Sequence, residues 1–209
     1  GSVSVRERAI GTFSVALEQS MPKSGGVSIV SQSGNIGSAA LRMLSDAGAG
    51  AARFIATGNE ADVQAADAIE WLSHDDETKV ILCCLETCRD AGRLTRALAV
   101  AREAKKPVVV LKIGTSDVGQ KAALSHTGGL AGSDRVYDAV FARYGAIRVK
   151  SLEDLVQVSA AIETLGARKV GKAPAAAMVA ASGGFGVLMA DAASENGVAV
   201  NTLTSETQA

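Results

Sequence analysis

The chain has 209 residues, of which 47% are hydrophobic, 21% charged and only 3% aromatic. That length allows one large core, or one domain and part of another, and the aromatic-poor composition suits helices packed closely over a parallel sheet. The formal net charge of −1, with basic residues scattered along the chain, provides no field for nucleic acid or for an anionic membrane surface. We find no apolar run long enough to span a membrane and no signal-peptide pattern, so we expect a cytoplasmic protein.

The first 23 residues predict a short helix followed by a linker. Gly-Ser at positions 1 and 2 is typical of the residues left by cleavage of an expression tag. Over residues 3–19 apolar side chains recur at helical spacing, with charged side chains on the opposite side. A proline and two glycines within residues 21–26 then end this predicted helix.

Residues 24–165 predict an α/β domain with a flavodoxin-like, doubly wound, parallel five-stranded sheet. Short apolar runs alternate with amphipathic stretches and define five β/α units. The predicted strands are residues 27–30, 52–57, 79–85, 107–111 and 146–149, and the helices that follow them end near residues 47, 72, 104, 144 and 165. Asp62 is expected to cap the second of these helices.

The C-terminal part of the sequence predicts a linker and the start of a second domain. Residues 166–174 are basic and poor in large apolar side chains, as linkers are. The pattern then restarts with a strand at 175–181, a glycine-rich turn at 182–186 and a helix at 187–196. One β/α unit cannot complete a sheet, so residues 175–209 predict the truncated start of a second flavodoxin-like domain. We therefore expect the chain to be a fragment of a longer protein.

The three cysteines, Cys83, Cys84 and Cys88, predict buried reduced thiols. Cys83 and Cys84 are adjacent in a strand-like run, so their side chains are expected on opposite faces. Metal binding favours paired ligands at a turn spacing such as Cys-x-x-Cys, which this sequence does not contain. We expect no metal site.

A glycine-rich loop after the fourth predicted strand carries His126, one of only two histidines. In doubly wound sheets ligands bind outside the carboxyl ends of the strands, which is where this loop begins. An isolated loop histidine is more often simply solvated, as we expect for His74 in a polar turn. The residues around His126 therefore decide its function.

Two other strand ends carry candidate site residues. Ser33 and Gly34 follow the first strand and open a helix, whose first N–H groups and dipole favour an anion, although Ser33 alone is more often only a helix cap. Glu86 ends the third strand. It is either solvated or paired with Arg89, or it accepts a hydrogen bond from one ring nitrogen of His126. That bond would fix the tautomer and leave the other nitrogen nucleophilic.

Residues 125–132, Ser-His-Thr-Gly-Gly-Leu-Ala-Gly, resemble the phosphohistidine loop of the NDP-forming acyl-CoA synthetases. This superfamily includes the ADP-forming acetyl-CoA synthetases and succinyl-CoA synthetase. Residues 30–34 and 58–62 also resemble stretches of the family, and the resemblance covers most of the chain from about Ser24. It implies that His126 is phosphorylated, that Glu86 orients it, and that two helix starts bind phosphate. The phosphate-binding residues it implies are Ser33, Gly34, Asn35, Thr127, Gly128, Ser182, Gly183 and Gly184.

The resemblance implies an acid-thiol ligase. In that reaction acyl-CoA and phosphate give an acyl phosphate, the phosphoryl group moves to His126, and ADP takes it to form ATP. ATP or ADP with Mg, CoA, phosphate and a small carboxylic acid or acyl-CoA are then substrates of the longer enzyme, and this chain binds no cofactor tightly. The implied partners are a CoA-binding Rossmann domain and an ATP-grasp domain, while a homo-oligomer stays open.

Three other functions remain open from the residues alone. The turn at residues 31–35 also resembles an FMN phosphate loop, so a flavodoxin-like electron-transfer module is an alternative, although aromatic walls for a flavin are missing after the third and fourth strands. A phosphoacceptor receiver domain needs acidic residues where this chain has Gln32 and Ser33. The last alternative is a catalytically silent binding fragment.

Overall fold

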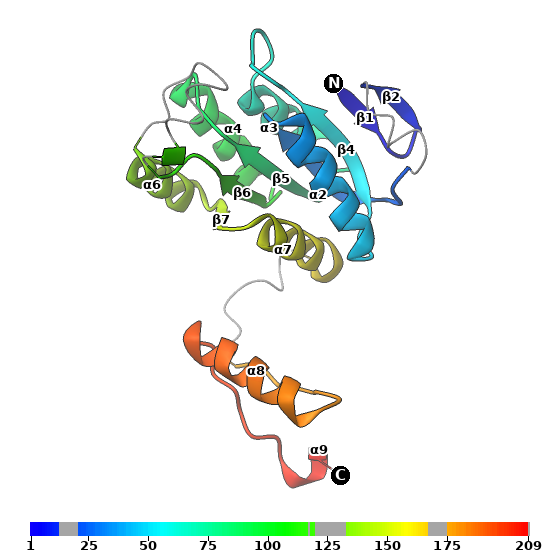
Figure 1. Ribbon diagram of the computed structural model, residues 1–209, viewed down its shortest axis with the longest axis vertical. Coiled ribbons are helices and arrows are strands. Elements are labelled where there is room, and N and C mark those ends of the chain that lie inside the picture. Colours follow the sequence, from blue (N-terminus) through cyan, green and yellow to red (C-terminus); the bar gives the residue numbers. More distant parts are fainter. Residues whose placement is uncertain (13–20, 117, 120–132, 167–174, 209) are drawn as a thin grey trace. The chain divides into compact units, whose positions relative to one another are not determined.

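The computed structural model describes residues 1–12, 21–116, 118–119, 133–166 and 175–208. The chain divides into two compact units, Gly1–Ala167 and Arg168–Ala209. The first unit contains a central sheet with helices on both faces, and the second contains a single longer helix, α8 (Figure 1).

The described part of the first unit is built on a seven-stranded sheet of order β2-β1-β4-β3-β5-β6-β7. The strands are β1 Ser2–Ser4, β2 Ala9–Gly11, β3 Ser24–Ser31, β4 Ala51–Ala56, β5 Val80–Leu85, β6 Val108–Lys112 and β7 Ile147–Val149. The strands from β3 to β7 pair in parallel. Taken in chain order they follow the 2-1-3-4-5 arrangement of flavodoxin-like folds, so the predicted fold class is confirmed.

Five helices of the described residues cover the two faces of this sheet. They are α2 Gly34–Asp46, α3 Ala65–His74, α4 Ala91–Glu103, α6 Asp134–Tyr144 and α7 Leu152–Leu165. The helices α2 and α7 lie on one face, and α3, α4 and α6 lie on the other (Figure 1). The fold is therefore doubly wound, with one apolar core on each side of the sheet.

Side chains along the strands alternate between these two cores. Ile29 and Leu82 pack with α2 and α7, whereas Val30 packs with α3, α4 and α6. All six residues of β5 are buried, as expected for a central parallel strand covered on both faces. Cys83 and Cys84 enter opposite cores as buried free thiols, which confirms their predicted placement. The third cysteine, Cys88, was also predicted to be buried but is only half-buried.

The helix predicted over residues 3–19 is wrong in its described part. Strands β1 and β2 form an antiparallel pair there, and β1 also pairs antiparallel with β4 at the edge of the parallel sheet; residues 13–20 lie outside the described residues. Val3 and Val5 are each 3% exposed. Their period of two suits a strand, and the free edge of β4 supplies backbone partners that a local helical pattern cannot reveal.

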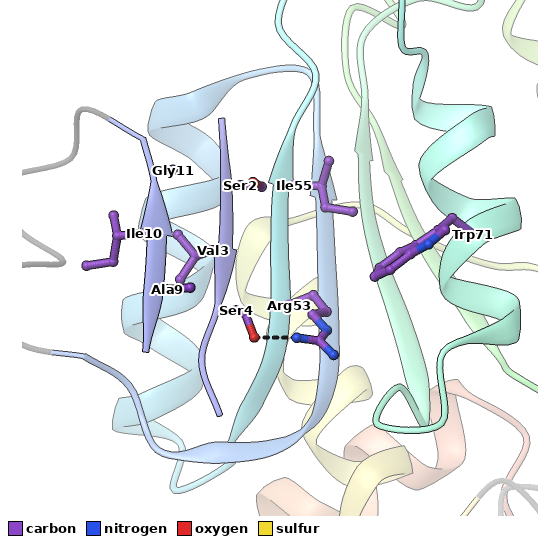
Figure 2. A pocket seen from close by; sticks show the side chains of 9 residues that line it. All are labelled: Ser2, Val3, Ser4, Ala9, Ile10, Gly11, Arg53, Ile55 and Trp71. Atoms are coloured by element: carbon purple, nitrogen blue, oxygen red, sulfur yellow. Dashed lines mark hydrogen bonds between the residues drawn. The ribbon is translucent and has the colours of Figure 1, made fainter. Parts of the chain in front are cut away.

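Figure 2 shows this strand pair beside β4, where nine residues line a groove of about 420 Å³. Arg53 of β4 donates a hydrogen bond to the Ser4 hydroxyl and forms ion pairs with Glu7, at 3.3 Å, and Asp75, at 3.4 Å. Its guanidinium carbon lies 6.0 Å from the ring centroid of Trp71 on α3. The N-terminal charges therefore connect this segment to the sheet and do not form the exposed side of a helix.

Helix starts differ from the sequence expectation at two places. The helix α3 begins at Ala65 with Gln64 as its N-cap, so the predicted cap Asp62 is wrong; the Gln64 N–H donates to the Asp67 carboxylate at 2.9 Å. In the second unit α8 spans Gly183–Glu195, and the glycine-rich turn forms its first turn. A short helix α9, Ser205–Gln208, follows it.

The strand predicted at 175–181 is reduced to a single parallel bridge between Ala176 and Val200 in the described residues. A strand gains most of its stability from neighbouring strands, and the described part of this unit contains only that one bridge. The strand prediction for 175–181 is therefore wrong apart from that bridge, because apolar composition does not provide the partner strands that stabilise a strand.

Gly37 of α2 gives a test of the packing between helix and sheet. A Cβ at this position would lie 2.4 Å from a ring carbon of Phe54, which is 2% exposed. We expect Gly37→Ala to lower the free energy of unfolding by about 1–3 kcal/mol, because the buried ring has to move, even though alanine favours helix. Urea denaturation measures this. The control is Gly34→Ala in the same helix, where a Cβ meets nothing within 4 Å and no loss is expected. Equal stability of the two variants would contradict the close approach.

Candidate functional site

The connections that follow β3 and β5 leave the sheet toward opposite faces. The strand β3 leads into α2 on one face, and its neighbour β5 leads into α4 on the other. In open α/β sheets ligands bind at the carboxyl ends of strands where the connections diverge in this way. The candidate site is therefore the edge formed by the ends of β3 and β5, with the end of β6 beside it.

The start of α2 contributes the first group of predicted site residues. Ser33 is the N-cap, and its hydroxyl accepts a hydrogen bond from the Ile36 N–H at 3.3 Å, so its capping role is confirmed. Gly34 and Asn35 are exposed in the first turn, which contains no acidic residue. The first N–H groups of a helix and the positive end of its dipole favour an anion. Phosphate binding at these three residues remains a prediction.

Glu86 follows β5 directly and is only 4% exposed. This burial excludes the solvated alternative, because a carboxylate removed from water needs polar partners. Its backbone N–H donates to the Gln32 side-chain oxygen at 2.5 Å, and its carbonyl accepts from the Lys112 ammonium at 2.7 Å. The structure thus places Glu86 at the diverging strand ends, next to the turn that leads into α2.

Gln32 connects the ends of β3 and β5. It is 7% exposed, and its backbone N–H donates to the Cys84 carbonyl at 3.3 Å. Its side chain makes three hydrogen bonds to the two residues after β5, all of them to backbone groups of Glu86 and Thr87. Sequence reasoning assigned no role to Gln32. The signal was a long polar side chain directly after a buried strand.

Lys112 ends β6 and is 4% exposed, which is unusual for a lysine. Its ammonium donates to the carbonyls of Glu86 and Ile113 and lies 4.9 Å from the ring centroid of Tyr137. Burial lowers the pKa of this ammonium, and the charge of Asp134 acts in the opposite direction. This residue was also missed, although a lysine at the end of an otherwise apolar strand was visible in the sequence.

Three predicted site residues, His126, Thr127 and Gly128, lie outside the described residues. The segment that contains them leaves β6 at Lys112 and leads to α6 at Asp134. Both ends of that segment are described, and the first of them contacts Glu86 through Lys112. The roles predicted for these three residues therefore stay predictions.

The second unit holds the remaining predicted residues at the start of α8. Ser182 is the N-cap, and its hydroxyl accepts from the Phe185 N–H at 3.5 Å. Gly183 and Gly184 are exposed, and a Cβ on either would meet no atom within 4 Å. Ser182, like Ser33, is an extended N-cap whose hydroxyl accepts from the N–H three residues further on, but Ser151 at α7 has the same pattern. The internal similarity seen in the sequence therefore stays a prediction.

Neither a metal cluster nor a membrane-spanning helix is found in the described part of the chain. No three His, Cys, Asp or Glu side chains gather there in a way that could hold a metal ion. None of the helices described is both long and apolar enough to cross a bilayer. The groove of Figure 2 is lined by none of the predicted site residues, so the strand ends remain the candidate site.

The cysteines give a test of burial at β5. Burial raises the pKa of Cys83 and raises that of Cys84 to about 11, whereas Cys88 is only half-buried and has a smaller rise. A raised pKa means less thiolate, which is the reactive form. At pH 8.5 we expect iodoacetamide to label Cys88 slowly and to leave the other two unmodified. Urea should expose all three, as peptide mass spectrometry would show. Labelling of Cys83 in folded protein as fast as Cys88 would contradict this placement.

Comparison with known proteins shows the family to which this chain is similar. A profile of the family described as "Succinyl-CoA ligase like flavodoxin domain" matches residues 24–162. The ADP-forming acetate–CoA ligase of Methanocaldococcus jannaschii is 38% identical over 173 residues, which are 81% of this chain and 23% of that protein. The ADP-forming acetate–CoA ligase I of Archaeoglobus fulgidus is 40% identical over 187 residues, 89% of this chain and 26% of that protein.

A solved structure extends the similarity to the whole chain. The dinucleotide-forming acetyl-coenzyme A synthetase 1 of Ca. Korarchaeum cryptofilum, in complex with phosphate and ADP, matches with a TM-score of 0.79 and 30% identity. The match covers 98% of this chain and 43% of that one, so this chain spans less than half the length of each of these three proteins. With its flavodoxin-like strand order and the family profile over residues 24–162, the chain belongs to the succinyl-CoA ligase-like flavodoxin domain family.

Proposed function

We propose that this chain is the phosphohistidine-bearing part of an ADP-forming acyl-CoA ligase. His126 would carry a phosphoryl group between an acyl phosphate and ADP. The observation that carries the proposal is the buried carboxylate of Glu86, held at the diverging ends of β3 and β5 next to the start of α2. The loop sequence at 125–132 and the ADP-forming ligases among the relatives support it.

The proposed chemistry has two transfers. In the first, one ring nitrogen of His126 attacks the phosphorus of the acyl phosphate; an N–P bond forms and the bond to the carboxylate oxygen breaks. In the second, the terminal oxygen of ADP attacks the same phosphorus, the N–P bond breaks and ATP leaves. Glu86 would accept a hydrogen bond from the other ring nitrogen, which fixes the tautomer and stabilises positive charge on the ring.

The helix starts would neutralise the phosphoryl charge in this scheme. Ser33, Gly34 and Asn35 at α2 offer backbone N–H groups, and Thr127 and Gly128 would add donors beside the histidine. We extend the same role to the turn 182–184 at α8, whose cap resembles that of α2. Mg²⁺ on the nucleotide, as is usual in phosphoryl transfer, belongs to the proposal.

The remaining parts of the reaction would come from sequence beyond this chain. The domain plan we propose is an N-terminal segment at 1–23, the phosphohistidine domain at 24–165, a linker at 166–174 and the beginning of a second such domain at 175–209. A CoA-binding Rossmann domain and an ATP-grasp domain would provide the CoA and nucleotide sites. One relative is the alpha subunit of an ADP-forming acetate–CoA ligase of Pyrococcus furiosus, 35% identical over 176 residues. Such partners could therefore be separate subunits.

The substrate class we propose is a small carboxylic acid and its CoA thioester. Relatives bear the names of acetate, 4-hydroxybutyrate and trans-feruloyl-CoA enzymes, so the acyl group differs among similar proteins. The cytoplasmic location expected from the sequence also remains a prediction. The family profile and the ligase relatives favour this function over the FMN-binding alternative.

The central prediction is that the complete enzyme becomes phosphorylated on His126. Incubation with ATP labelled in the γ-phosphate should give a label that is stable in base and labile in acid, and His126→Ala should abolish it. The matched control is His74→Ala, because His74 is the only other histidine and lies exposed at the end of α3. Label that persists in His126→Ala would refute the assignment, and an unlabelled wild-type enzyme would favour a catalytically silent fragment.

A second prediction concerns Glu86. We expect Glu86→Gln to keep the fold and to slow phosphorylation of His126 by about 10²-fold or more. Without the carboxylate, neither the tautomer of the imidazole nor the orientation of its ring is fixed for attack. The control is Glu163→Gln on α7, a carboxylate that accepts from the Gly26 N–H at 3.1 Å, at the other end of β3. Rapid-quench measurement of the labelled enzyme separates the two variants. A wild-type rate in Glu86→Gln would leave that residue with a structural role only.

A further inference from the structure

The two residues that follow β5 are held by side chains from both neighbouring strands. Glu86 and Thr87 are 4% and 6% exposed, so water cannot satisfy their backbone groups. All four of these groups, two N–H and two carbonyls, have a side-chain partner. The partners are Gln32, at the end of β3, and Lys112, at the end of β6.

Gln32 provides three of the four bonds. Its side-chain oxygen accepts from the N–H groups of Glu86, at 2.5 Å, and Thr87, at 3.0 Å. Its amide nitrogen donates to the Thr87 carbonyl at 2.9 Å. The single amide group of Gln32 therefore holds the N–H groups of Glu86 and Thr87 and the carbonyl of Thr87.

Lys112 provides the fourth bond, from its ammonium to the Glu86 carbonyl at 2.7 Å. A buried ammonium is costly unless it is well paired, and within the described ranges it forms no ion pair closer than 4.0 Å. Its partners are instead two backbone carbonyls and the face of the Tyr137 ring. A neutral apolar side chain would avoid the cost of burying the charge but would leave the Glu86 carbonyl without this donor.

Together these contacts fix Glu86 from both sides. The N–H on one side of its Cα is held from β3, and the carbonyl on the other side is held from β6. The position of the Glu86 Cα and the direction of its Cα–Cβ bond are then set by the neighbouring strands. Orientation to within a fraction of an ångström matters for group transfer, where a misplacement of about 1 Å costs on the order of 10²-fold in rate.

We propose that Gln32 and Lys112 are positioning residues that aim the Glu86 carboxylate at its catalytic partner; this inference rests on the function proposed above. Neither residue touches the reacting phosphoryl group in this proposal, and both act through Glu86. Their removal slows the transfer to His126 and leaves the binding of nucleotide unchanged.

The test is a double-mutant cycle in the complete ligase. Gln32→Met and Lys112→Met remove the polar groups at similar side-chain length, and each is combined with Glu86→Gln. We expect each single variant to lower the single-turnover rate of His126 phosphorylation by about 10- to 100-fold, with the dissociation constant for ATP unchanged. In the Glu86→Gln background the same substitutions should lower this rate by less than about threefold, because the effects of substitutions that act through one group are not additive.

The matched control is Ser28→Ala. Ser28 of β3 is fully buried and bonds the Thr78 hydroxyl at 2.7 Å, just before β5 begins, so this change removes a buried hydrogen bond at the opposite end of the same strand pair. It should lower the melting temperature and leave the rate unchanged. If Gln32→Met does not fold, Gln32→Glu keeps the oxygen that accepts both N–H bonds and removes the amide donor to Thr87, and it should show a smaller loss.

The outcomes separate this inference from the proposed function. If Glu86→Gln is slow while Gln32→Met and Lys112→Met keep the wild-type rate, or lose equally in both backgrounds, the positioning role is overturned and the proposed function stands. If Glu86→Gln itself keeps the wild-type rate, Glu86 has a structural role only and the positioning inference is overturned with it, and if His126 takes no label, the proposed function fails. Losses confined to the background with an intact Glu86 support the inference.

Discussion

The central strand β5 has no face toward water, and this constraint shapes the part of the structure where we place the site. Its six residues are buried between two cores, so the chain that leaves it still lies inside the protein for two more residues. Backbone groups buried there need partners, and the parallel ladder has already ended. Side chains from the flanking strands take over that task, Gln32 from one side and Lys112 from the other. Buried polar groups at a strand end thus become a rigid support for Glu86.

The same edge of the sheet brings together groups of opposite character. The start of α2 provides N–H groups and no acidic residue. Glu86 provides a buried carboxylate directly after β5, the strand that pairs with β3. An anion favours the first, and a ring nitrogen that carries a proton favours the second. Phosphoryl transfer through a histidine requires both, because it needs charge neutralisation and an oriented nucleophile. The diverging connections of the doubly wound sheet make this combination possible, since each strand end faces the same edge.

The second unit contains a helix whose apolar residues are not covered by a sheet in the described residues. Its helix α8 leaves several large apolar residues exposed, among them Phe185, Leu188 and Met189. A helix that is apolar on most sides is normally covered by other elements. The described residues of this unit contribute only one β-bridge. The similarity of the whole chain to less than half of a larger synthetase agrees with our proposal that further sequence completes it.

The sequence by itself determined the class of the fold, the succession of its β/α units and the cap at Ser33, because apolar periodicity and capping chemistry act over a few neighbouring residues. It also pointed to Glu86 through its place at a strand end. Only the tertiary structure decided that the first residues form strands, since their partner β4 lies about fifty residues away in the chain. In the same way only the folded sheet revealed Gln32 and Lys112 as supports of Glu86. The hydrogen bonds that define their roles join segments far apart in sequence, and such contacts leave no local pattern to read.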